Sequence, residues 1–108
     1  MKIIGNEIRL TRGDDETLTV SVDEKPFVAG DKVELTVREM AGYGNALIHK
    51  TVTEFTDGKA VFHFSPEDTS PLKFGKYSYD CQVTFADIGV KTIIRPSQFV
   101  VEVENTYE

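Results

Sequence analysis

The chain has 108 residues, of which 40% are apolar, and a formal net charge of −6 at pH 7. This length predicts one domain over residues 1–108, with one core that buries roughly two thirds of the unfolded chain's surface. The basic residues are dispersed, which argues against nucleic acid or an anionic membrane as partner, because both are bound by clustered Lys and Arg. No apolar run approaches the roughly 20 residues of a membrane-spanning helix.

The N-terminal seven residues lack the apolar stretch and the small-residue cleavage site of a secretory signal. We therefore expect the chain to be made in the cytoplasm. Cys81 is the single cysteine, which excludes an internal disulfide. It lies in an alternating apolar run, so we expect a small core residue rather than a nucleophile.

The first half of the chain carries three segments in which apolar and polar residues alternate, the pattern of a half-buried strand. These predicted strands are residues 7–11, 17–22 and 32–38. Turn formers at 12–15 predict a hairpin-like reversal between the first two. Pro26 ends the second strand, and residues 27–28 are expected to add a short edge piece. The inward side chains of the second and third strands should be Leu18, Val20, Val22, Val33, Leu35 and Val37.

Residues 40–45 contain Gly42 and Gly44 and follow no period, which indicates a loop. The loop should expose Met40 and Tyr43, since neither has a place in a core phase. Exposed apolar groups on loops mark interaction surfaces, so these two residues are candidate contacts to a partner.

The middle of the chain predicts a hairpin followed by a short helix. Residues 46–55 are rich in β-branched residues and predict a strand, and Asp57-Gly58 is a signal for a two-residue hairpin turn. Residues 51–55 should therefore pair with residues 60–64, whose inward set would be Ala60, Phe62 and Phe64. Ser65-Pro66 is typical of a helix start, so we expect one 3₁₀ or α turn near residues 66–70, crossing between sheets.

The longest alternating run covers residues 77–85. Its inward side chains should be Tyr77, Tyr79, Cys81, Val83 and Phe85. Five such side chains on one strand require an opposing apolar surface, which predicts a second sheet and hence a β-sandwich.

The remaining segments complete the predicted sheet. A tight hairpin at residues 86–89 should return the chain along residues 90–95. Pro96-Ser97 is expected to interrupt the strand, because proline cannot donate to a ladder. Residues 98–104 should then finish the sheet with Phe99, Val101 and Val103 in phase.

The spacing Leu72-x-x-Gly75-x-Tyr77 resembles the corner before the penultimate strand of immunoglobulin-like sandwiches. In that corner a Tyr hydroxyl bonds to a nearby backbone group. The resemblance implies a hydrogen bond from Tyr77 to backbone within residues 66–72. Gly75, Tyr77, Tyr79 and Cys81 are accordingly the residues expected to matter for structure.

Several motifs taken together resemble small phage and prophage proteins of Gram-positive bacteria, and are similar to the N-terminal domain of the baseplate upper protein. The motifs are Arg12-Gly13-Asp14, Pro66-Glu67-Asp68-Thr69, Gly75-Lys76-Tyr77-Ser78-Tyr79-Asp80, and Thr92-Ile93 through Pro96-x-x-Phe99-x-Val101. The resemblance spans nearly the whole chain, although Asp87-Ile88-Gly89 replaces a plain Asp-Gly turn.

The resemblance implies an immunoglobulin-like antiparallel β-sandwich of about seven to nine short strands. It also implies a structural role in a virion tail or baseplate. Other tail or baseplate proteins would be the partners, and the chain could form a homo-oligomer in the assembly.

The sequence predicts no enzyme, no cofactor and no metal site. His49 and His63 should fall on adjacent strands but not opposite each other, and they lack a third ligand at metal-binding spacing. Glu67 and Asp68 are adjacent acids at a helix start, where acids are favoured electrostatically. The acidic run at 14–16 lacks the spaced ligands and glycine of a calcium loop.

A second function class remains open, a carbohydrate- or cell-surface-binding immunoglobulin-like module. Sugar-binding sandwiches usually present exposed aromatic residues, often Trp. This chain contains no Trp. Tyr43 and Tyr107 are the tyrosines outside the predicted core phases, which favours assembly over sugar binding.

Overall fold

The computed structural model describes residues 1–40 and 44–103, and within these ranges it contains eight strands and one short helix. The helix is α1 (Pro66–Thr69), close to the predicted turn at residues 66–70. The all-β prediction is confirmed. The strands are β1 (Lys2–Ile4), β2 (Glu7–Thr11), β3 (Glu16–Val20), β4 (Lys32–Arg38), β5 (Ile48–Val52), β6 (Ala60–Phe64), β7 (Gly75–Phe85) and β8 (Gly89–Glu102).

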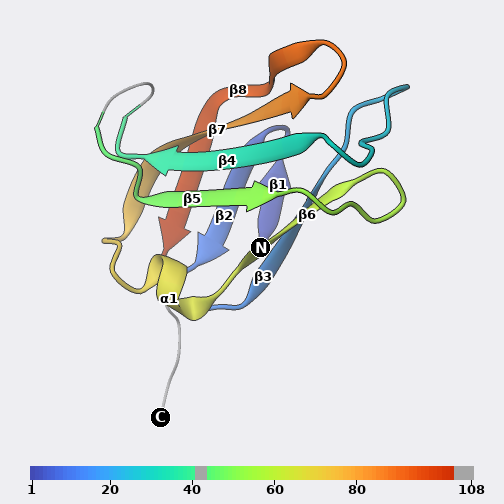
Figure 1. Cartoon of the computed structure of the whole chain (residues 1–108). Coiled ribbons are helices and arrows are strands. Elements are labelled where there is room, and N and C mark those ends of the chain that lie inside the picture. The colour runs from blue at the N-terminus through green and yellow to red at the C-terminus, as the bar shows by residue number, and fades with distance from the viewer. Residues whose placement is uncertain (41–43, 104–108) are drawn as a thin grey trace.

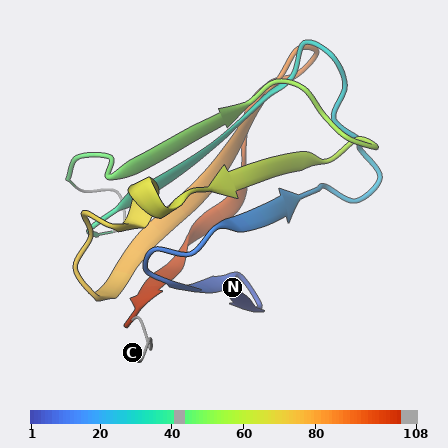
Figure 2. The ribbon, with the colours of Figure 1, turned by 90° about the horizontal axis from the view of Figure 1, so that it is seen from below.

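The strands form two sheets that face each other as in a β-sandwich (Figures 1 and 2). The larger sheet has the order β1-β2-β8-β7-β4-β5, and the smaller one pairs β3 with β6. All pairs are antiparallel except β2 with β8, which run parallel. Helix α1 carries the chain from β6 in the small sheet toward β7 in the large one, as predicted.

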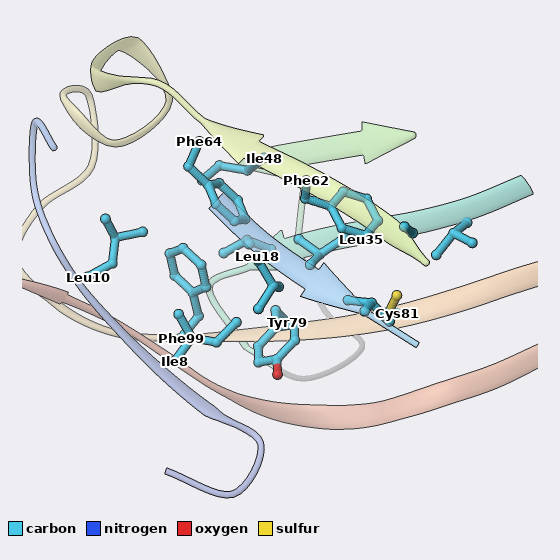
Figure 3. Close-up of a cluster of buried hydrophobic side chains, with 14 of the residues drawn as sticks. Ile8, Leu10, Leu18, Leu35, Ile48, Phe62, Phe64, Tyr79, Cys81 and Phe99 are labelled. Carbon is cyan, nitrogen blue, oxygen red and sulfur yellow. The ribbon is translucent and has the colours of Figure 1, made fainter. Parts of the chain in front are cut away.

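The core lies between the two sheets and takes side chains from both (Figure 3). The alternation in the sequence predicts its members correctly on β3, β4, β6 and β7, because side-chain direction alternates along any strand. The rings of Phe64 and Phe99 meet across the sheets at 5.8 Å between centroids. The fully buried side chains include Ile8, Leu10, Val33, Leu35, Val37, Phe62, Phe64, Cys81, Val83, Phe99 and Val101.

The predicted reversal between β2 and β3 does not form a hairpin, because the two strands belong to different sheets. The Arg12 N–H continues the β2–β8 ladder by donating to the Glu102 carbonyl at 3.1 Å. The next N–H, that of Gly13, donates to Thr69 Oγ1 at 2.9 Å. The chain is thus held to the start of the α1–β7 connection and crosses to the small sheet instead of doubling back.

The predicted pairing of residues 51–55 with residues 60–64 is wrong, although the turn between them forms. Asp57 and Gly58 have φ angles of 52° and 74°, and Thr56 and Lys59 bond to each other in both directions at 3.0 Å. Beyond that bridge the chain separates, since β5 pairs with β4 and β6 pairs with β3. The turn therefore links the two sheets.

Residues 27–28 form no strand, contrary to prediction. The Phe27 N–H donates to the Gly58 carbonyl at 2.9 Å, and the Phe27 ring lies 5.2 Å from that of Phe55. Phe27 is buried and Val28 is 59% exposed. This segment thus anchors the 57–58 turn and does not extend a sheet.

Three further features differ from the sequence prediction. Strand β1 was not predicted, and β8 runs through Pro96 without a break. The β7–β8 register shifts twice between Tyr79 and Gln82, and such bulges accommodate a residue that cannot donate to the ladder. Val103 lies beyond β8 and is 60% exposed, so it is not a core residue.

Candidate functional site

Tyr77 bonds to nearby backbone, but its acceptor lies outside the predicted segment. Its hydroxyl donates to the Lys73 carbonyl at 2.6 Å, one residue beyond the predicted acceptor segment 66–72. Gly75 begins β7 with a φ of 147°, a conformation that favours glycine. The Tyr77 ring is partly buried against the core. The corner therefore fixes the chain where it enters β7.

Tyr79 ties the N-terminal hairpin to the core. Its hydroxyl donates to the carbonyl of Asn6, in the turn between β1 and β2, and Figure 3 shows it facing that turn. Burial raises the pKa of Tyr79 to about 12, so the phenol stays protonated at neutral pH. The alternation of β7 predicts that Tyr79 is a core residue, but it cannot predict a partner that lies far away in the chain.

Cys81 is fully buried, as the alternation predicts. Burial, together with the nearby charge of Asp80, raises the pKa of the thiol to about 12. A thiol with so high a pKa supplies almost no thiolate at neutral pH. Its place is in the core, at the centre of β7.

The two candidate contact residues can be placed only in part. Met40 lies just beyond β4, which ends at Arg38, and is 64% exposed, as an accessible apolar group should be. Tyr43 lies outside the described residues. Their role in contacting a partner stays a prediction.

The outer face of the large sheet carries a polar network that the sequence does not predict. The β4–β5 register places Thr36 opposite His49, with Thr36 Oγ1 3.0 Å from His49 Nδ1. On the other side of the ring, His49 Nε2 lies 3.2 Å from a carboxylate oxygen of Glu34. The network depends on β5 pairing with β4, whereas the sequence favoured pairing with β6.

The order hydroxyl, imidazole, carboxylate resembles a nucleophilic relay, but its setting does not suit catalysis. Such a relay needs a concave site with donors for an oxyanion beside an accessible nucleophile. Thr36 is 8% exposed and sits in the middle of a sheet strand, and the pocket described below is lined by other residues. The network is best explained as side-chain pairing across neighbouring strands.

The other titratable groups considered in the sequence do not converge. His49 and His63 lie in different sheets, which corrects the prediction of adjacent strands, and His63 faces Asp15 at 3.4 Å. Burial alone would raise the pKa of Asp68, but hydrogen bonds from Lys50 and from the Ser65 N–H lower it. In the part of the chain that the structure describes, no three His, Cys, Asp or Glu residues are placed to hold a metal ion.

The most distinctive surface is the open side of the sandwich, where β3 lies beside the N-terminal hairpin (Figure 2). A pocket of about 300 Å³ opens there, and we call it the edge pocket. Its polar lining includes Asn6, Thr19, Ser21 and the hydroxyl-bearing Tyr79. Its apolar lining consists of Ile3, Ile8, Leu18, Val20, Ile93 and Ile94.

Two strand edges border the edge pocket. On the side of β8 that faces β2, only the end of the strand, from Phe99 to Glu102, is paired, so residues 89–97 of β8 have a ladder partner on one side, β7. Strand β3 likewise pairs on one side, with β6. Ile3 and Ile4 of β1 are 51% and 53% exposed, and Ile3 lines the pocket. This arrangement can bind an extended strand or an apolar side chain, but it brings no reactive groups together.

Comparison of the chain with protein-family models, curated proteins and solved structures finds no significant match. Among residues 1–40 and 44–103, no helix is both long and apolar enough to span a membrane.

Proposed function

We propose that the chain is a non-enzymatic structural module of a phage or prophage tail or baseplate, acting through protein–protein assembly. The observation that carries the assembly part is the open side of the sandwich. There, half-exposed Ile3 lines a pocket with both polar and apolar walls, beside unpaired strand edges, and half-exposed Ile4 follows it in β1. Exposed apolar groups and free strand edges are both features of protein-binding surfaces. The phage context rests on the motif resemblance, and it makes the chain a virion-associated protein produced in a bacterial cytoplasm.

We further propose that the sandwich is immunoglobulin-like. The strand order supports this assignment, since β2-β8-β7-β4-β5 faces β3-β6, and the chain alternates between the sheets. The Tyr77–Lys73 hydrogen bond supports it as well, because a tyrosine corner precedes the penultimate strand of many such domains. A repeated module of this kind would present the same edges around the symmetry axis of an assembly.

The test is co-expression with the products of neighbouring tail genes, followed by purification and crosslinking. We expect a complex that Ile3→Lys weakens, because a charge at the edge pocket opposes an apolar contact. The matched control is Ile88→Lys, since Ile88 is 54% exposed in the β7–β8 hairpin, away from the pocket. The control should leave the complex intact.

The carbohydrate-binding alternative predicts a different outcome. In that case the chain would bind no neighbouring product and would bind a cell-wall glycan, with an affinity abolished by Tyr43→Ala. That combination of results would replace the assembly proposal.

A further inference from the structure

The free strand edges of this protein differ in how they are protected against pairing with another chain. The open half of β8 carries Lys91, Arg95 and Pro96, together with two register shifts. On β5, Lys50 forms an ion pair at 2.8 Å with Asp68 of helix α1. Strand β1 has only three residues and begins with Lys2. Lys and Pro on an edge, bulges and short length all hinder strand addition.

Strand β3 lacks these protections. Its five residues include no Lys, Arg or Pro, and its register with β6 is unbroken. The N-terminal amine contacts Glu16, the first residue of the strand, and the edge from Thr17 onward borders the edge pocket. The other strand of the small sheet, β6, contacts β5 and runs into Pro66, so its outer side is partly covered. Among the described strands, the β3 edge is thus the least protected.

We propose that two copies of this chain pair along β3, antiparallel, about a two-fold axis at Thr19. This inference rests on the proposed function, because it names one partner for the same surface. The small sheets would join into one four-stranded sheet, in the order β6-β3-β3-β6. An isologous contact of this kind is the commonest way in which identical chains associate.

The β3 sequence is self-complementary in this register. Thr19 faces Thr19 of the second copy, Leu18 faces Val20, and Thr17 faces Ser21, the residue that follows the end of β3. Thr17 and Thr19 are exposed, whereas Leu18 and Val20 are buried, so hydroxyls meet on the outer face and aliphatic groups on the inner face. Such matched cross-strand pairs stabilise a sheet.

The edge pocket gives this pairing an apolar contribution. Leu18, Thr19 and Val20 line the pocket as well as forming the edge, and Ser21 lines it just beyond the strand, so an added strand would lie across its mouth. The added strand would remove from water the partly buried Ile93 and Ile94 on the far wall. Each copy carries a net charge of −6, so salt should strengthen the association by screening repulsion.

Oxidative crosslinking of Thr19→Cys tests the register directly. Directly opposed residues of antiparallel strands approach closely enough for a disulfide, so this variant should form a covalent dimer. Cys81 does not compete, since it is fully buried. The control is Thr92→Cys, an exposed position on the protected edge of β8. Crosslinking no faster for Thr19→Cys than for the control would overturn the proposal.

Sedimentation equilibrium on the unmodified chain gives a second measurement. We expect self-association that rises with concentration and salt, is lost in Thr19→Lys and persists in Thr92→Lys. Circular dichroism establishes that both variants are folded. If the wild-type chain stays monomeric but binds a neighbouring tail protein, the dimer inference is overturned and the proposed function is not. A dimer that binds no such protein supports the inference and contradicts the proposed function.

Discussion

Two tyrosines on β7 use their hydroxyls in different surroundings. The Tyr77 hydroxyl bonds to Lys73 at the exposed corner, whereas Tyr79 is 3% exposed and bonds to Asn6. A net hydrogen bond contributes about 0.5 to 1.5 kcal/mol to stability, with buried bonds at the upper end. We expect Tyr77→Phe to cost about 0.5 kcal/mol and Tyr79→Phe about 1.5 kcal/mol in urea unfolding. An unchanged midpoint for Tyr77→Phe would contradict the corner assignment.

Asp31 is the buried acid of the described chain, and it joins two loops. Its carboxylate accepts hydrogen bonds from the Val28 N–H at 2.9 Å and the Ala86 N–H at 3.0 Å. Asp31 is 4% exposed. These bonds lower the pKa of Asp31 in the folded state. The unfolded pKa is about 3.9, so the stabilisation is present above that pH and is lost as the pH falls through the folded pKa.

Asp31→Asn should therefore destabilise the protein at neutral pH and reduce its loss of stability in acid. The side-chain oxygen of Asn can accept one of the two N–H groups, but its NH₂ group would face the other N–H, and both are donors. Urea unfolding at neutral and acid pH measures both effects. Asp23→Asn, at an exposed turn position, is the control and should change neither.

The Cys81 thiol should be inert to a thiol reagent until the protein unfolds. The pKa of Cys81 in the folded protein is about 12, above the ordinary value of 9.0. The stabilisation from keeping this thiol protonated is therefore complete below about pH 9 and is lost as the pH rises toward 12. Cys81→Ala should make stability less sensitive to alkali. Rapid labelling of the native chain would show that the core opens around β7.

At the scale of elements, side-chain phase could be predicted from the sequence and strand partners could not. Alternation identified the buried positions of β4 and β6 because it depends on the local backbone alone. Asp57-Gly58 predicted its own turn correctly, but the partners of β5 and β6 are set by packing between the sheets. The His49 network and the edge pocket depend on those pairings, so neither could be found by spacing. The local bond of Tyr77 could be predicted, because its donor and acceptor lie four residues apart, but the predicted acceptor segment ended one residue before Lys73.

The 57–58 turn gives a prediction at the same scale. Gly58 has a φ of 74°, and a Cβ there would lie 2.6 Å from the Cβ of Pro26. Gly58→Ala should cost about 1 to 3 kcal/mol for the backbone strain alone, with a further cost for the clash. Gly13→Ala is the matched control, since Gly13 has a φ of 88° and open space around its Cβ position. Equal losses of stability for the two variants would show that the contact with Pro26 is not tight.

At the scale of the whole molecule, the large sheet collects six strands and the small sheet two. The small sheet covers only part of the inner face, and the Tyr79–Asn6 hydrogen bond holds the N-terminal hairpin to the core on the side beside β3. The edge pocket remains where this closure is incomplete. The surface proposed for assembly is therefore a direct result of the unequal sheets.

The parallel pairing of β2 with β8 also affects the order in which the chain can fold on the ribosome. Ile8 pairs with Phe99, and Leu10 pairs with Val101. The inner side chains of β2 can therefore be covered only after β8 has been synthesised. Pairings between such distant segments form slowly, because a large loop must close first. Nascent chains that lack β8 would leave Ile8 and Leu10 accessible to chaperones, and we expect the cooperative core to form only after that strand has left the exit tunnel.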